Sequence, residues 1–207
     1  FSTIERKLTS IEAQKLKDDG IRVFGIGIGI NEGVRLELQK EMEEIGSDPD
    51  SEHVFNLEDF NALQSIERSL IRRTCREAAP ECFSQVDFVI MLDSSGSINR
   101  EDFERVLNFI RQLSSRLDVD SGLARIALVI FSTTTTVIFD LDDFQRNTDI
   151  SRAIQNTPYE HGRTNTADAL RFVREEIFSS ARGDRFGVQN VVLMVTDGES
   201  SDERATI

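Results

Sequence analysis

Apolar residues recur along the chain with two different periods, and segments of the two kinds alternate. Short, nearly continuous apolar runs predict strands buried in a sheet at residues 21–30, 53–57, 86–92, 124–133, 135–141 and 188–200. Apolar residues spaced by three or four positions predict helices at 11–19, 34–45, 58–74 and 100–117, with another beginning after residue 166. Strands that alternate with helices indicate an α/β fold with a mostly parallel sheet.

Composition limits the size and the partners of this fold. The 207 residues, 39% of them hydrophobic, suffice for one domain of ordinary size or two small ones. The net charge of −13 argues against binding to nucleic acid or to an anionic membrane surface, because both would repel the chain. No apolar run approaches the roughly 20 residues of a membrane-spanning helix. Residue 1 falls within an apparent helix and not a signal peptide, so we expect the chain to be a piece of a longer protein.

Polar residues gather where the predicted strands end. Asp93, Ser95 and Ser97 follow the strand at 86–92 directly, and Asp197 follows the last strand. Thr164 lies in a loop before a helix. Ligands of open parallel sheets collect beyond the carboxyl ends of the strands. Carboxylate and hydroxyl oxygens suit Mg²⁺, Mn²⁺ or Ca²⁺, and they do not suit zinc or copper.

The charge of this oxygen set indicates what the ion would do. The two carboxylates of Asp93 and Asp197 only balance a divalent cation, and hydroxyls add no charge. Mg²⁺ tolerates an incomplete protein shell. The ion would therefore keep a position open for an anionic oxygen from outside, most simply an Asp or Glu side chain of a partner.

Helix capping is the alternative explanation of the serine-rich stretch. Ser97 or Asn99 precedes a predicted helix whose first turn contains Glu101 and Asp102, which is a usual capping arrangement. Capping does not require Thr164 or Asp197 at the matching positions of other loops, so we favour the metal site.

Cys75 and Cys82 are the only cysteines. They are either two free thiols in a linker or half-cystines of a secreted protein. Their spacing does not fit a CxxC redox motif, and there is no second Cys pair or nearby His for a zinc site.

At this point the motifs resemble a known family. The stretches "DSSGS" (93–97), "GRTNTADAL" (162–170) and "VTDGE" (195–199) are similar to the metal-ion-dependent adhesion site of von Willebrand factor type A domains. The stretches "KLKDDGIRVFGIGIG" and "IGSDPDSEHVFNLEDFNAL" look like later segments of the same family. The resemblance implies a doubly wound, Rossmann-like, mostly parallel sheet with one antiparallel edge strand and helices on both faces.

The resemblance also assigns the site residues, and the chain differs from the family pattern at His161. It places Asp93, Ser95 and Ser97 at the D-x-S-x-S positions, Thr164 at the threonine and Asp197 at the last aspartate. Family members often have Gly-Gly before the threonine, whereas this chain has His161 and then Gly162. That histidine either lines the rim of the site or is an exposed loop residue.

The order of the segments differs from that of a single family domain. Residues 1–74 resemble the C-terminal part of an A-type domain, and 86–207 resemble its N-terminal part with the metal site. A Cys-flanked linker, 75–85, joins them. We predict a circularly rearranged A domain, assembled within one chain or by exchange of segments between chains. The alternative is two partial domains with intervening residues absent from the sequence.

The resemblance implies an adhesion module, with no enzymatic activity, that binds a protein through a divalent cation. Two neighbouring A-domain segments in one chain resemble the tandem A domains of matrilins, type VI collagen and byssal-thread matrix proteins. We therefore expect a secreted protein of the extracellular matrix with a matrix protein, collagen first, as partner. A metal-independent structural module and an intracellular A-domain scaffold are the alternatives. Catalysis is not favoured, because Ser95 stands where haloacid dehalogenases need an Asp and no G-x-S-x-G motif is present.

Overall fold

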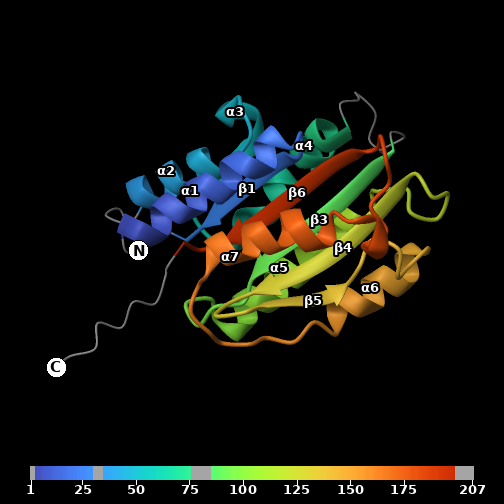
Figure 1. Cartoon of the computed structure of the whole chain (residues 1–207). Helices are drawn as coiled ribbons and strands as arrows, with labels where there is room; N and C mark the ends of the chain where they lie inside the picture. The colour runs from blue at the N-terminus through green and yellow to red at the C-terminus, as the bar shows by residue number, and fades with distance from the viewer. Residues whose placement is uncertain (1–2, 30–34, 76–84, 199–207) are drawn as a thin grey trace.

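The computed structural model describes residues 3–29, 35–75 and 85–198, which build one six-stranded sheet in the order β2-β1-β6-β3-β4-β5 (Figure 1). The strands are β1 (Arg22–Ile28), β2 (Val54–Leu57), β3 (Val86–Asp93), β4 (Ala124–Phe131), β5 (Thr135–Phe139) and β6 (Gln189–Thr196). All neighbouring strands pair in parallel except β4 and β5, which are antiparallel at the edge. The fold predicted from the sequence is confirmed.

Helices cover both faces of this sheet. The helices are α1 (Thr3–Asp18), α2 (Arg35–Ile45), α3 (Asp50–His53), α4 (Leu63–Cys75), α5 (Arg100–Ser114), α6 (Asn147–Gln155) and α7 (Thr166–Phe172), which continues as a π-helical turn, η2 (Val173–Ile177). Buried residues of α1, α2 and α7 form one hydrophobic core, and those of α4, α5 and α6 form the other. The sheet is therefore doubly wound.

Alternation along β3 shows why the central strands are apolar on both sides. Phe88, Ile90 and Leu92 belong to the core beneath α4, α5 and α6, whereas Val89 and Met91 belong to the core beneath α1, α2 and α7. All five side chains are at most 1% exposed. Because helices cover both faces, the strand is apolar from Phe88 to Leu92; Asp87, near its start, is buried and forms an ion pair with Arg185 at 2.7 Å.

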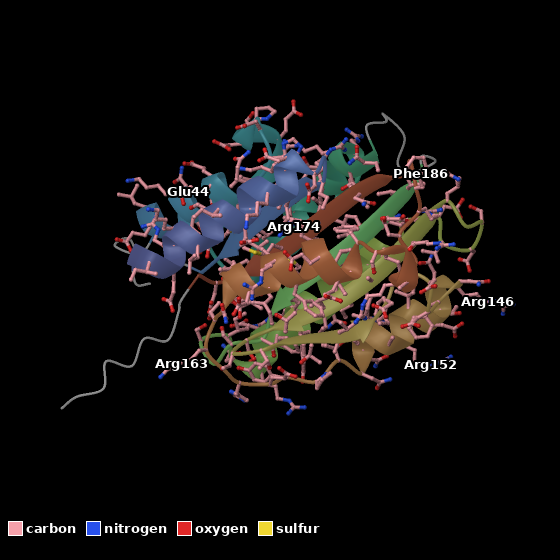
Figure 2. The ribbon with its side chains drawn as sticks, in the orientation of Figure 1. Glu44, Arg146, Arg152, Arg163, Arg174 and Phe186 are labelled. Atoms are coloured by element: carbon pink, nitrogen blue, oxygen red, sulfur yellow. The ribbon has the colours of Figure 1, made fainter. Side chains whose placement is uncertain are left out.

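The two segments of the chain meet inside the sheet, where the second and third strands in its order pair. β1 pairs with β6 in parallel over six residues, from Arg22 opposite Val191 to Gly27 opposite Thr196. Beside this pairing α1 packs on α7, and Arg174 of η2 lies 3.6 Å from the Glu12 carboxylate of α1 (Figure 2). The assignment of the segments to two ends of an A-type domain stays a prediction.

The structure departs from the sequence expectations at a few places. Helix α6 was not predicted, because Ile150 and Ile154 are its only buried apolar residues. The four-residue helix α3 occupies the predicted start of the second strand. Val34, Cys82 and most of the linker lie outside the described residues, as does the side chain of Cys75. None of the described helices is long and apolar enough to cross a membrane.

Candidate metal site

The carboxyl ends of β3 and β6 place the two predicted aspartates next to each other. The strands are direct neighbours in the sheet, with Leu92 opposite Val195. Asp93 ends β3 and Asp197 follows β6, so both carboxylates lie at the same edge. Asp93 is fully buried and Asp197 is 7% exposed.

Hydrogen bonds gather four of the five predicted residues around one point. The Ser95 backbone N–H donates to Asp93 Oδ1 at 2.8 Å. Ser95 Oγ lies 2.9 Å from Ser97 Oγ, and Ser97 Oγ donates to Asp197 Oδ1 at 2.9 Å. Oxygens of Ser95, Ser97 and Asp197 thus form a continuous polar chain across two loops.

The loop that carries Thr164 is attached to the first loop by its backbone. Ser95 and Gly162 form an isolated parallel bridge, and the Gly96 N–H donates to the Gly162 carbonyl at 3.0 Å. A Cβ on Gly162 would lie 2.7 Å from Ser132 Oγ, so only glycine permits this close approach. Thr164, two residues further on, is buried. The structure therefore brings the loops of all five predicted residues together.

Thr196 supports the site and was missed by the sequence analysis. Its hydroxyl donates to Asp93 Oδ2 at 2.6 Å and accepts from the Gly198 N–H at 3.0 Å. Gly198 has φ +67°, and a Cβ there would lie 2.2 Å from the Leu38 side chain of α2. The stretch "VTDG" contains the signal, because the threonine is the last residue of β6 and adjoins the predicted aspartate.

The capping alternative and the metal site use different residues. Asn99 is the N-cap of α5, and its side chain accepts from the Asp102 N–H at 2.9 Å. Ser97 instead donates to Asp197. The helix is therefore capped without drawing on the three residues of the D-x-S-x-S motif.

The electrostatics of Asp93 fit a cation. Burial raises the pKa of the Asp93 carboxyl, while hydrogen bonds from Thr196 and Ser95 lower it. No described Lys, Arg or His forms an ion pair with Asp93. A buried carboxylate is costly without a cationic partner. The described residues hold no group of three or more His, Cys, Asp or Glu that could bind a metal ion, and the set of two carboxylates and three hydroxyls stays a prediction.

Two aromatic residues form the rim of the site. Tyr159 donates its hydroxyl to the Ile98 carbonyl, beside the serine loop. Burial raises the pKa of Tyr159, and the charges of Asp197 and Asp93 raise it further. The His161 ring contacts Tyr159 in a tilted arrangement, with ring centroids 4.0 Å apart and an interplanar angle of 47°. His161 is exposed at a φ of +47°, an unusual backbone conformation for a residue other than glycine.

Comparisons with known proteins point to one family. The profile of the von Willebrand factor type A domain matches residues 7–69 and 87–207. Mouse collagen alpha-4(VI) chain is 33% identical over 92% of this chain, and mouse matrilin-1 is 26% identical over 92%. The chain covers 9% and 45% of these two relatives, respectively.

A solved structure gives the same result. Proximal thread matrix protein 1 from the mussel byssus, with a zinc-occupied MIDAS motif, superposes with a TM-score of 0.54 at 28% identity. The match covers 94% of this chain and 47% of that one. With the sheet order and the family profile, it shows that the chain belongs to the von Willebrand factor type A domain family.

Proposed function

We propose that this chain is a metal-ion-dependent adhesion module of the extracellular matrix, which binds an acidic group of a matrix protein through a divalent cation. Collagen is the first candidate ligand. The observation that carries the proposal is the hydrogen-bonded set of Asp93, Ser95, Ser97 and Asp197 at the carboxyl ends of β3 and β6. Relatives that are matrix proteins support the location and the non-enzymatic role.

Asp93, Ser95, Ser97, Thr164 and Asp197 would hold the ion, which is Mg²⁺ or, as alternatives, Mn²⁺ or Ca²⁺. When bound, the cation supplies an electrophilic position for an anionic oxygen. The chain's own residues orient the ligands: Thr196 and the Ser95 N–H fix both oxygens of Asp93. Because the hydroxyls add no negative charge, the two carboxylates do no more than balance the ion, which can still accept a carboxylate oxygen from the partner at its open position.

The test has two readouts, one for the metal and one for adhesion. Calorimetry with Mg²⁺ and Mn²⁺ measures the metal site directly. Binding to fibrillar collagen is then measured in Mg²⁺ and in EDTA, for the wild type and for Asp93→Ala. Asp120→Ala, which removes an exposed carboxylate from a distant turn, is the matched control.

We expect metal binding and collagen binding to be lost in Asp93→Ala and kept in Asp120→Ala. Collagen binding that survives both EDTA and Asp93→Ala would assign recognition to a metal-independent face. Absence of metal binding in the wild type would overturn the proposed function itself.

A further inference from the structure

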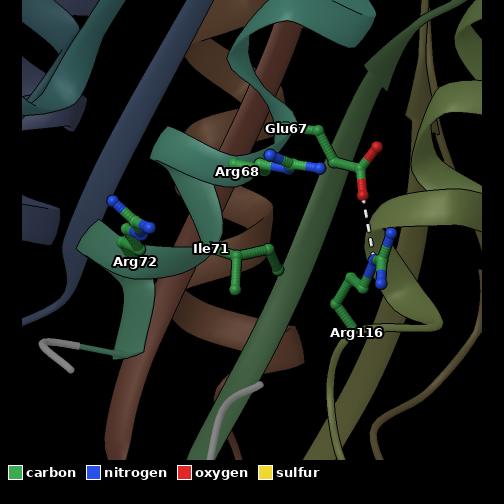
Figure 3. A pocket seen from close by; sticks show the side chains of 5 residues that line it. All are labelled: Glu67, Arg68, Ile71, Arg72 and Arg116. Atoms are coloured by element: carbon green, nitrogen blue, oxygen red, sulfur yellow. Dashed lines mark hydrogen bonds and ion pairs between the residues drawn. The ribbon is translucent and has the colours of Figure 1, made fainter. Parts of the chain in front are cut away.

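A groove far from the metal loops gathers positive charge in this acidic protein. It lies between α4 and the turn that follows α5, and Glu67, Arg68, Ile71, Arg72 and Arg116 line it (Figure 3). Three guanidinium groups and one carboxylate line it, so its lining carries two net positive charges. The chain as a whole has a net charge of −13.

Two of these arginines have no partner among the described residues. Glu67 is engaged by Arg116, whose Nε donates to Oε1 at 3.0 Å (Figure 3). Neither Arg68 nor Arg72 forms a hydrogen bond or an ion pair with any residue that the structure describes. They stand four positions apart on α4, where like charges repel each other. The guanidinium N–H groups of Arg68 and Arg72 are therefore available to donate to an anion.

The free carbonyls at the C-terminal end of α4 do not explain why Arg68 and Arg72 are there. Cations near a helix C-terminus usually serve its free carbonyls. Here Arg22 of β1 donates to the carbonyls of Arg73 and Thr74, at 3.3 and 3.1 Å. Arg73 turns away and donates to the Ser51 and Glu52 carbonyls. Arg22 therefore binds carbonyls at the C-terminal end of α4, and Arg68 and Arg72 are not needed there.

The size and floor of the groove limit its occupant. Its volume is about 180 Å³, which is below the ~300–1,000 Å³ of pockets for drug-sized ligands. Ile71, 3% exposed, lies among the arginines, and the methylene stems of arginines add apolar surface. Such a groove fits an apolar side chain flanked by carboxylates. A sulfated polysaccharide has no apolar side chain and needs a longer cationic strip than one helical turn.

The groove is separate from the metal site. Helix α5 begins three residues after Ser97 and ends two residues before Arg116. Its 15 residues span roughly 22 Å at 1.5 Å per residue. A ligand in the groove therefore does not reach the metal loops.

We propose that the groove between α4 and the turn after α5 binds an acidic peptide segment of a protein partner, independently of divalent cations. Carboxylates of the segment pair with Arg68, Arg72 and Arg116, and a neighbouring apolar side chain rests on Ile71. Bidentate geometry makes arginine well suited to carboxylates. The module would then have a second, metal-independent contact to its partner.

The test uses a capped synthetic peptide, Gly-Leu-Asp-Glu-Leu-Gly, and its amide isostere with Asn and Gln. Both are titrated in EDTA, and the arginine Nε–H resonances of the protein are followed by NMR. The variants are Arg68→Gln/Arg72→Gln and the control Arg146→Gln/Arg152→Gln, which removes equal charge from α6 and its start (Figure 2). Circular dichroism verifies that each variant is folded.

We expect the acidic peptide to shift the resonances of Arg68, Arg72 and Arg116, and the isostere to leave them unchanged. Affinity should fall at least tenfold in the groove variant and stay within twofold in the control variant. The proposal is overturned if the acidic peptide binds with a Kd weaker than about 5 mM or does not bind at all. Equal binding of the amide isostere also overturns it. A heparin hexasaccharide that displaces the peptide with higher affinity overturns it as well, since the site would then recognise a polysaccharide. None of these outcomes bears on metal binding at Asp93.

Discussion

The regions beside the two ends of α5 have opposite charges, and their charged side chains differ in burial and in hydrogen bonding. At its start, Asp93 is fully buried and both of its oxygens accept hydrogen bonds. At its end, Arg68 and Arg72 are exposed on α4, without a partner among the described residues. A buried charge requires an opposite charge to be stable, whereas an exposed charge is already solvated by water.

This difference teaches how each end recognises an anion. In the proposed function, the metal loops must first take up a cation, and only then do they attract a carboxylate. The groove presents its positive charge directly, at low cost and with low intrinsic strength. We therefore expect large effects from changes at the buried end and small effects at the exposed end.

Asp93→Asn should cause the largest change. The variant keeps the shape of the side chain but removes one of the two negative charges of the site, and we expect Mg²⁺ affinity to fall by more than about 100-fold. Without metal, its melting temperature should equal or exceed that of the wild type, because the buried charge is gone. Calorimetry and thermal denaturation in EDTA measure both. A destabilised metal-free variant would show that Asp93 serves mainly to hold the fold.

Glu41→Gln tests a second buried carboxylate near the same end. Burial raises the pKa of Glu41 on α2 to about 7; Arg6 lowers it, and the charges of Glu44 and Asp93 raise it. The native state therefore binds a proton that the unfolded state releases near pH 4.5. Its contribution to stability is complete below pH 4.5 and is lost as the pH rises through about 7.

We therefore expect Glu41→Gln to match the wild type below pH 4.5 and to be more stable at pH 8 by on the order of 2–3 kcal/mol. Urea denaturation in EDTA at several pH values gives the two curves. Glu37→Gln, at an exposed position of the same helix, is the control. Parallel curves for Glu41→Gln and the wild type would mean that Glu41 is charged in the native state throughout.

Thr196→Val removes a hydrogen bond and keeps all five predicted metal ligands. Because Thr196 orients Asp93 through a 2.6 Å hydrogen bond, we expect Mg²⁺ affinity to fall about tenfold. Thr196→Ser retains the hydroxyl and should restore most of the affinity. If both variants bind Mg²⁺ equally, the hydroxyl does not position the carboxylate.

The sequence could predict which residues gather in the metal loops better than it could predict which residues line the groove. Asp93, Ser95 and Ser97 follow a continuous apolar strand, and parallel strand ends meet at one edge, so their place in space follows from local patterns. The groove joins Arg116 to Arg68, 48 positions away in the sequence, through the packing of α4 beside α5. No periodicity reveals such a contact. Thr196 was overlooked because a threonine at a strand end usually needs no functional reason.

Glu67→Gln should give the smallest effect and the sharpest test of the exposed end. Glu67, 13% exposed, pairs with Arg116, whose side chain is 53% exposed; because water reaches the arginine, losing the pair should change stability by about 1 kcal/mol. The groove would then carry three positive charges, and we expect the acidic peptide to bind roughly threefold more tightly by NMR titration. Arg116→Gln makes the opposite change and should weaken binding by a similar factor. If both variants weaken binding, the Glu67–Arg116 pair shapes the groove; opposite shifts mean that charge alone sets the affinity there, as it cannot at the buried end.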